Sequence, residues 1–159
     1  MRLARTPAPP TGLLDGALHL FPVRVYYEDT DLSGIVYHAN YLRWFERARS
    51  DLLRLLGIDQ RAAAEAGEGT YAVADLAIRY RAPARLDDAV TIATRATEIG
   101  AASVRLKQHV IAPRADGTEQ TLSEADIRVG FVAPDGRPRR QPASWRAAFD
   151  AFLKSEEFE

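Results

Sequence analysis

The sequence predicts an α+β fold in which a five-stranded antiparallel sheet wraps around one long helix. Three observations indicate this fold: one long stretch with helical spacing of apolar residues, several stretches that alternate apolar and polar residues, and turn signals between them. The length of 159 residues favours a single domain. A sheet covered by one helix leaves its edge strands exposed, so we also expect the chains to associate side by side.

We expect three segments along the chain. Residues 1–20 mix prolines, glycines and charged residues without a regular period, which predicts a flexible extension rather than an export signal. Residues 21–154 carry every periodic stretch and form the single domain, and residues 155–159 form a C-terminal tail. No stretch approaches the roughly 18 apolar residues of a membrane span. The sequence therefore predicts a cytoplasmic protein.

The domain is expected to begin with a strand from Pro22 to Thr30, where apolar and polar residues alternate. A loop rich in turn-forming residues follows over 31–40. Apolar residues then recur three or four positions apart, which predicts the long helix, with Asn40 as its N-cap and Gly57 as its stop. Residues 59–69 predict a short second helix.

Four long strands and a last helix complete the expected domain. Turn signals lie around Pro83, at Gly100, and at two later clusters of Pro, Asp and Gly. The turn at Gly100 is short enough to join two strands as a hairpin, which favours an antiparallel sheet. The final apolar stretch predicts a short helix. The four strands are expected over residues 70–82, 89–100, 102–112 and 121–133.

The composition argues against several classes of function. Lys and Arg number 21 against 22 Asp and Glu, so the chain as a whole attracts neither nucleic acid nor an anionic membrane. The absence of Cys excludes disulfides, thiolate nucleophiles and Cys-ligated zinc. His19, His38 and His109 are too scattered for a His-rich metal centre. We therefore expect no metal site and no nucleic-acid partner.

The segment from Tyr26 to Asn40 is the main candidate for chemistry, because it places three acids, a histidine and a glycine directly before the long helix. Backbone N–H groups at a helix start are unsatisfied and lie at the positive end of the helix dipole, so they can stabilise an oxyanion. A carboxylate beside them can attack a carbonyl or activate water. Acidic loops before helices also serve as plain turns and caps, and the spacing alone leaves both interpretations open.

Two stretches of the sequence resemble one family of enzymes. The stretch VRVYYEDTDLSGIVYHANYLRWFERAR, at residues 23–49, is similar to the signature of the 4-hydroxybenzoyl-CoA thioesterase family of the hotdog-fold superfamily. More narrowly, it resembles the branch of acyl-CoA thioesterases encoded beside the Tol-Pal cell-envelope genes, the YbgC-like branch. The stretch YRAPARLDD, at residues 80–88, matches a second recurrent phrase of that branch.

This resemblance implies hydrolysis of acyl-CoA to a carboxylate and CoA, without a metal, prosthetic group or other cofactor. It implies that Asp31 is the catalytic carboxylate, as nucleophile or as general base, and that the backbone N–H of His38 is the oxyanion donor, with a contribution from its imidazole. Glu46 is the alternative acid, because other hotdog thioesterases carry theirs on the central helix. An ion pair of Glu46 with Arg43 or Arg49 is the simpler interpretation.

Four further residues are expected to contact the substrate. Gly34 permits a backbone conformation that is closed to other residues, and Tyr27 is a strand residue first and a pocket residue second. Ser103 and Arg140 correspond to places where the resembled family contacts the CoA nucleotide, whose phosphates require basic groups. Arg140 lies in the run GRPRRQP after the last strand, and this run also fits a solvated surface.

The resemblance implies a homotetramer, built as a dimer of dimers with the active site shared between subunits, and a substrate carried by CoA or by an acyl carrier protein. Trp44 and Leu53 lie off the apolar stripe of the long helix, and we expect them to meet a partner subunit. Two alternatives of other classes stay open. One is a non-catalytic hotdog module that binds acyl-CoA or acyl carrier protein. The other is a hotdog hydratase, which the seven-residue interval from Asp31 to His38 disfavours.

Overall fold

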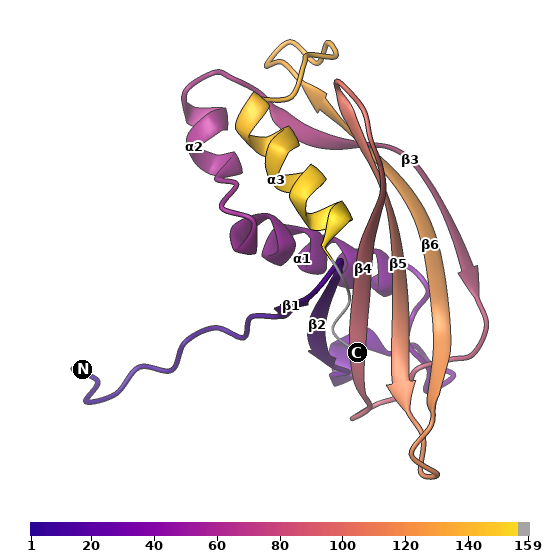
Figure 1. Cartoon of the computed structure of the whole chain (residues 1–159). Coiled ribbons are helices and arrows are strands. Elements are labelled where there is room, and N and C mark those ends of the chain that lie inside the picture. Colours follow the sequence, from indigo (N-terminus) through magenta and orange to yellow (C-terminus); the bar gives the residue numbers. More distant parts are fainter. Residues whose placement is uncertain (156–159) are drawn as a thin grey trace.

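The computed structural model describes residues 1–155 of the chain, so the predicted tail at 155–159 lies outside the described residues beyond Ser155. A six-stranded sheet curves around helix α1, and α2 and α3 lie on the same side of the sheet (Figure 1). The strand order is β1-β2-β4-β5-β6-β3, and every neighbouring pair is antiparallel. The α+β class is confirmed, whereas the sheet has six strands instead of the expected five.

The long helix, the short second helix, the four long strands and the final helix all form where the sequence predicts them, within a few residues. In chain order, the elements are β1 Leu13–Asp15, β2 Leu18–Arg24, a 3-10 helix at Tyr27–Asp29, α1 Asn40–Leu55, α2 Gln60–Glu65, β3 Thr70–Tyr80, β4 Ala89–Ile99, β5 Ser103–Pro113, β6 Glu119–Val132 and α3 Ala143–Lys154.

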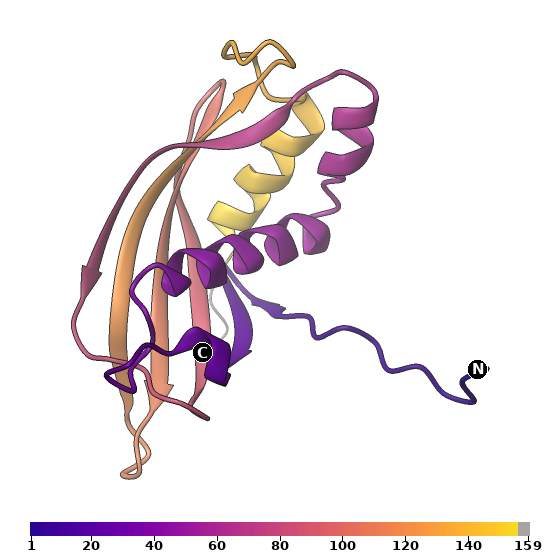
Figure 2. The ribbon, with the colours of Figure 1, turned by 180° about the vertical axis from the view of Figure 1, so that it is seen from behind.

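The sixth strand comes from the segment that we expected to be a flexible extension, residues 1–20. Its first residues lie away from the body of the protein (Figure 2), but β1 and β2 form a hairpin on the edge of the sheet. The carboxylate of Asp51, on α1, accepts hydrogen bonds from Thr11 Oγ1 (2.8 Å) and Gly12 N–H (2.9 Å), and it lies 2.7 Å from His19 Nε2. The expected flexible extension is therefore wrong from Thr11 onward, because the Asp51 carboxylate on α1 holds this part of the segment in place.

The first predicted strand is displaced toward the N-terminus and ends at Arg24 instead of Thr30. Its pairing with β4 stops where Arg24 lies opposite Ala89. Beyond that point the Tyr26 N–H donates to Asp29 Oδ2 at 2.8 Å, and the chain turns into a short 3-10 helix. Tyr27 consequently lies on an exposed turn and not on a strand.

Helix α1 buries its apolar stripe against the sheet, as its spacing predicts. Gly57 ends the helix with a φ of +77°, a left-handed conformation that glycine adopts without strain. Trp44 and Leu53 are buried in the core of their own chain, so the expectation that they meet a partner is wrong: the curved sheet and the elements after α1 surround more than one face of the helix. The buried stripe consists of Tyr41, Phe45, Ala48 and Leu52.

A row of buried polar side chains lies between α1 and the sheet. His19, Thr94 and Gln108 stand in register on β2, β4 and β5, and all three are fully buried. Gln108 Oε1 accepts a hydrogen bond from Arg49 at 2.8 Å, and Gln108 Nε2 donates to Thr94 Oγ1 at 2.9 Å and to the Phe45 carbonyl at 3.1 Å. Hydrogen bonds thus attach the middle of α1 to the sheet inside an otherwise apolar core.

Candidate active site

The loop between β2 and α1 folds back against the turn that follows β3. The Val36 N–H donates to the Ala84 carbonyl at 2.9 Å, and Ile35 forms an isolated antiparallel bridge with Arg85. Ile35 and Val36 are apolar residues within a polar loop, and their contacts explain why the loop packs against the protein. The two sequence stretches that carry the family resemblance therefore meet at this place.

Asn40 fixes the entry of the chain into α1. We expected it to be the N-cap, but Ala39 takes that position and Asn40 is the first helical residue. The Asn40 side chain instead donates from Nδ2 to the Asp29 carbonyl at 2.8 Å, across the loop. The Asp29 carbonyl also accepts the Tyr37 N–H at 2.9 Å. Asp29 is therefore a structural residue of the loop, and His38 lies directly before the N-cap.

Asp31 lies in this loop with its carboxylate exposed to solvent. Its Oδ1 accepts hydrogen bonds from the hydroxyl and from the N–H of Ser33, the latter at 2.8 Å. These bonds are the main reason why the pKa of the Asp31 carboxyl is lowered, and the charge of nearby His38 acts in the same direction. Asp31 is therefore ionised at neutral pH, and both hydrogen bonds from Ser33 fall on the same oxygen, Oδ1.

Gly34 closes the turn that holds Asp31. Its φ is +79°, and its N–H donates to the Asp31 carbonyl at 3.1 Å. A side chain at this position is strained by the backbone conformation, although nothing lies within 4 Å of where its Cβ would stand. The expected conformational role of Gly34 is confirmed.

His38 stands at the start of α1 beside unpaired backbone donors. Among the residues that the structure describes, none accepts a hydrogen bond from the N–H of His38 or of Ala39. The hydroxyl of Tyr80 donates to the His38 carbonyl at 2.8 Å. The His38 ring contacts the rings of Tyr37 and Tyr80, with centroids 4.5 Å and 6.2 Å away.

A hollow of about 310 Å³ opens beside His38, between the loop, the first turn of α1 and the end of β3. Its walls are mostly apolar, which suits an acyl group or another small apolar ligand. The one cation at its edge, Arg81, is paired with Glu124. The hollow is lined by Ile35, Val36, His38, Tyr41, Tyr80, Arg81, Ala82 and Pro83.

Sequence reasoning identified His38 at this hollow but missed Tyr80. A signal was present, because the alternation in β3 places Tyr80 on the same side of the strand as Leu76 and Ile78, which pack against the core. Tyr27, which we expected to contact substrate, is not among the residues that line the hollow.

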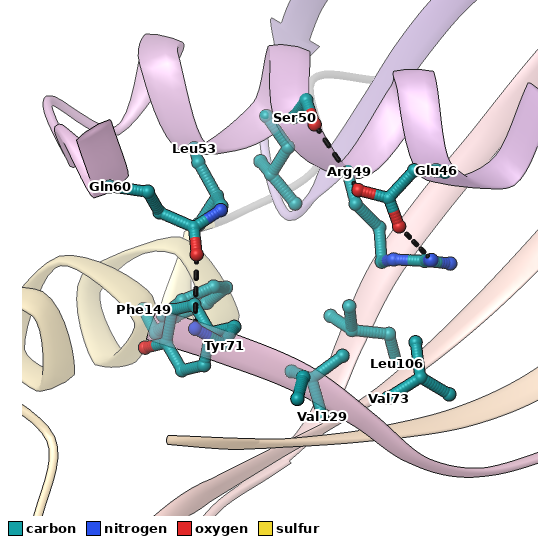
Figure 3. A pocket seen from close by; sticks show the side chains of 12 residues that line it. Glu46, Arg49, Ser50, Leu53, Gln60, Tyr71, Val73, Leu106, Val129 and Phe149 are labelled. Atoms are coloured by element: carbon teal, nitrogen blue, oxygen red, sulfur yellow. Dashed lines mark hydrogen bonds and ion pairs between the residues drawn. The ribbon is translucent and has the colours of Figure 1, made fainter. Parts of the chain in front are cut away.

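A second, much smaller cavity of about 60 Å³ lies further along α1, between the helix and the start of β3 (Figure 3). Glu46, the alternative catalytic acid, lies at this cavity, where its carboxylate accepts hydrogen bonds from Arg49 and Ser50. It is eight residues from His38, or about 12 Å along the helix. Glu46 therefore belongs to the ion pair that its spacing predicts and lies outside the loop site.

Ser103, an expected nucleotide contact, lies near the opposite end of the sheet from the loop site. It stands opposite Gly130 on β6, whereas Tyr80, which touches His38, stands opposite Ser123 on the same strand. Seven residues of β6 separate the two positions, or about 23 Å. In one subunit, Ser103 and the loop site therefore lie at different ends of the sheet.

Arg140 lies at that far end, on an open hollow of about 540 Å³ beside the start of α3. Arg146 lines the same hollow, as does Asp150, whose carboxylate is paired with Lys154. Within residues 1–155 neither guanidinium has an acidic partner or a hydrogen-bond acceptor. Two unpaired guanidinium groups at one hollow are suited to bind phosphate.

Comparison with known families identifies the fold family of the chain. Residues 25–153 match the model of a family described as the thioesterase-like superfamily. The chain belongs to this superfamily. The match covers the loop, α1 and all four long strands, and it confirms the resemblance to hotdog thioesterases.

Members of the thioesterase-like superfamily similar to this chain include two curated bacterial enzymes. The acyl-CoA thioesterase YbgC of Haemophilus influenzae is 38% identical over 125 residues, which cover 79% of this chain and 92% of that protein. The acyl-CoA thioester hydrolase YbgC of Escherichia coli is 39% identical over 137 residues, covering 86% and 98%. Among solved structures, the 4-hydroxybenzoyl CoA thioesterase of Pseudomonas sp. strain CBS-3 has a TM-score of 0.74 at 25% identity, covering 83% and 99%.

Residues 1–155 contain no group of three or more His, Cys, Asp or Glu side chains that could hold a metal ion. None of the helices in the same residues is long and apolar enough to span a bilayer.

Proposed function

We propose that this protein is an acyl-CoA thioesterase, which hydrolyses acyl-CoA to a free carboxylate and CoA. One observation carries the proposal: the ionised, exposed carboxylate of Asp31 lies in the loop that leads to two unpaired backbone N–H groups at the start of α1. The relatives named as acyl-CoA thioesterases align with this chain over most of their length, which supports the same chemistry.

Asp31 acts on the carbonyl carbon of the thioester. As a nucleophile, one of its oxygens forms a mixed anhydride while the C–S bond breaks and CoA leaves as a thiolate, and water then hydrolyses the anhydride. As a general base, it takes a proton from the water molecule whose oxygen attacks the same carbon, and the C–S bond then breaks to release CoA as a thiolate. In both routes the carbonyl oxygen becomes an oxyanion that the His38 N–H stabilises, and the His38 imidazole positions the substrate or the water.

The reaction requires no metal and no cofactor in this proposal. The backbone donors and the dipole at the start of α1 supply the positive potential that a Lewis acid supplies in metal-dependent hydrolases. Water is the second substrate, and Asp31 supplies the only ionised group that the chemistry needs.

We further propose that a second subunit completes the site. Within residues 1–155, β3 is an edge strand that pairs with β6 alone, and the middle of β3 is exposed. Antiparallel pairing of two β3 strands about a twofold axis runs the Thr70 end of one strand along the Tyr80 end of the other. The end of one subunit that carries Ser103 and Arg140 then lies beside the Asp31 loop of its partner.

In this arrangement Arg140, with Arg146 beside it, holds the phosphates of the CoA nucleotide, and Ser103 contributes a hydroxyl nearby. Tyr27 and Gly34 border the substrate at the loop end of the same site. Two dimers associate into a homotetramer. An acyl carrier protein is the alternative donor, because its phosphopantetheine arm presents the same thioester without the nucleotide.

A thiol-release assay tests the proposed function across a panel of acyl-CoAs of increasing chain length, with benzoyl-type thioesters included. Asp31→Asn should lower kcat by about 100-fold or more, because it removes the nucleophile or base. Glu46→Gln is the matched control, the same carboxylate-to-amide change on α1, and it should stay near wild type.

The assay also separates the alternatives. Binding of acyl-CoA without turnover would indicate a binding module, and hydration of an enoyl-CoA without thiol release would indicate a hydratase. Loss of activity in Glu46→Gln with an unimpaired Asp31→Asn would contradict the assignment of the catalytic carboxylate.

A further inference from the structure

We propose that the Ala39 N–H is a second oxyanion donor beside the His38 N–H and that Tyr80 is its positioning residue, an inference that rests on the proposed thioesterase function. Tyr80 is the last residue of β3, and the end of that strand lies beside the start of α1 (Figure 1). It touches the backbone of His38 from outside the loop that carries Asp31. Tyr80 therefore influences the donors without being part of the loop itself.

Tyr80 is held firmly enough to orient another group. Its ring packs edge to face against Tyr41, with centroids 5.4 Å apart, and Tyr41 is buried. The Tyr41 hydroxyl in turn accepts a hydrogen bond from the Ala84 N–H at 3.0 Å. A chain of fixed contacts thus runs from the core of the protein to the Tyr80 hydroxyl, which donates to the His38 carbonyl at 2.8 Å.

The peptide unit between His38 and Ala39 explains what this hydrogen bond does. The His38 carbonyl and the Ala39 N–H belong to one planar unit and point in opposite directions. A donor fixed on the carbonyl side therefore sets the direction of the N–H and increases its polarity. The Ala39 N–H has no acceptor within residues 1–155, so it is available to donate a hydrogen bond to a ligand.

The start of α1 lacks the usual device that fixes such groups. Helices commonly begin with a Ser, Thr, Asp or Asn whose side chain accepts a hydrogen bond from a first-turn N–H. Here the N-cap is Ala39, no side-chain cap hydrogen bond forms, and the first turn carries no acid. Tyr80 holds the helix start from the carbonyl side instead, which leaves the N–H groups unoccupied. This is the arrangement that a preorganised oxyanion site requires.

Tyr80→Phe tests the inference, because it removes the hydroxyl and keeps the ring against Tyr41 and His38. We expect kcat for acyl-CoA hydrolysis to fall by about fivefold to tenfold, the effect of one lost neutral hydrogen bond. KM should stay within about twofold and the melting temperature should remain nearly constant, because the hydroxyl is bound to the His38 backbone and Tyr80 is partly exposed. A KM effect alone would contradict a positioning role.

Thr97→Val is the matched control. It removes another hydroxyl that donates to a backbone carbonyl, that of Arg105 at 3.3 Å, from an exposed position on β4. Its kcat should equal that of the wild type. An equal loss of kcat in both variants would show a general effect on the sheet and would overturn the inference.

An NMR readout without substrate separates positioning from a merely structural role. In Tyr80→Phe, the Ala39 amide proton should move upfield, because its peptide unit is less polarised. Tyr80→Leu also removes the ring, so in that variant the imidazole signals of His38 should shift as well. The chain has only three histidines, which makes those signals simple to assign.

The outcomes distinguish this inference from the proposed function. If the wild type releases no thiol from any acyl-CoA, the proposed function fails, whatever the Ala39 amide shows. If the wild type is active and Tyr80→Phe matches it in kcat with the Ala39 amide unmoved, the thioesterase stands and the role of Tyr80 is refuted.

Discussion

The separation of Asp31 from Arg140 predicts what happens when two impaired variants are mixed. Asp31→Asn impairs the loop site, and Arg140→Glu impairs the far end of the sheet. The two ends are well separated, because Ser103 at the far end lies about 23 Å along β6 from the position of Tyr80 at the loop site. In the shared site that we propose, each reaction centre takes Asp31 from one subunit and Arg140 from the other. A mixed dimer then contains one site with both lesions and one site with none.

The size of the recovery follows from counting sites. Random exchange of two variants in equal amounts makes about half of the dimers mixed, and one of the two sites in each is intact, so about one quarter of the wild-type sites return. If both residues act within one subunit, every site in the mixture carries a lesion. Activity then stays at the mean of the two parent variants.

The assay is thiol release at an acyl-CoA concentration well below KM, after the two differently tagged variants have been co-refolded. Purification through both tags isolates the mixed dimer, which should have about half of the wild-type activity. A mixture of Asp31→Asn with His38→Ala is the matched control, since both lesions lie at the same loop and no site is restored. Absence of recovery in the Arg140→Glu mixture, with both variants folded and dimeric, would refute the shared site.

Four other results are expected. Ser33→Ala removes the hydroxyl that most lowers the pKa of Asp31, so that pKa should rise and the acid limb of the kcat profile should move to higher pH; an unmoved limb would contradict this. Burial lowers the pKa of His19 from 6.5, so below that pH the unfolded chain takes up a proton that the folded chain does not, and the free energy of unfolding should fall. Urea unfolding at pH 7.5 to 5 should show a flatter dependence in His19→Gln, and an identical slope would refute the argument. Phe45 is fully buried, so Phe45→Ala should cost about 3–5 kcal/mol of unfolding free energy, measured in urea. Exhaustive chelation should leave the hydrolysis rate unchanged, and a rate restored only by added Zn²⁺ or Mn²⁺ would overturn metal independence.

Long periodic patterns made most of the helices and strands predictable. Contacts between residues remote in sequence determined the features that these patterns did not predict, such as the end of β2 and the N-terminal hairpin. The alternation after Pro22 continues through Tyr27, yet β2 stops at Arg24, because its pairing with β4 ends there and the Asp29 carboxylate accepts the Tyr26 N–H. Likewise, Asp51 has helical spacing for a surface pair with Arg47. It is buried instead, and it holds the N-terminal hairpin that the sequence pattern did not reveal.

The candidate site was predictable only where its residues are close in sequence. Asp31, Gly34 and His38 share one loop, so its composition and the family resemblance point to them together. Tyr80 reaches His38 because the sheet order places β3 at an edge, with its end beside the start of α1. Ser103 lies far from that loop for the same reason, and the distance between positions remote in sequence is fixed only by the folded sheet.

The buried polar row between α1 and the sheet determines where the first turn of the helix comes to rest. Apolar side chains interdigitate in several nearly equivalent ways, so a wholly apolar contact allows a helix to slide along a sheet at a small cost. Arg49 donates a hydrogen bond to Gln108, and Gln108 donates one to the Phe45 carbonyl, so a shift of the helix along the sheet would break both bonds. These bonds thus fix the position of α1 along the sheet, and with it the position of His38, before the first turn of the helix, relative to Tyr80. We therefore expect a change at Gln108 to alter the position of His38 relative to Tyr80, although Gln108 contacts neither residue.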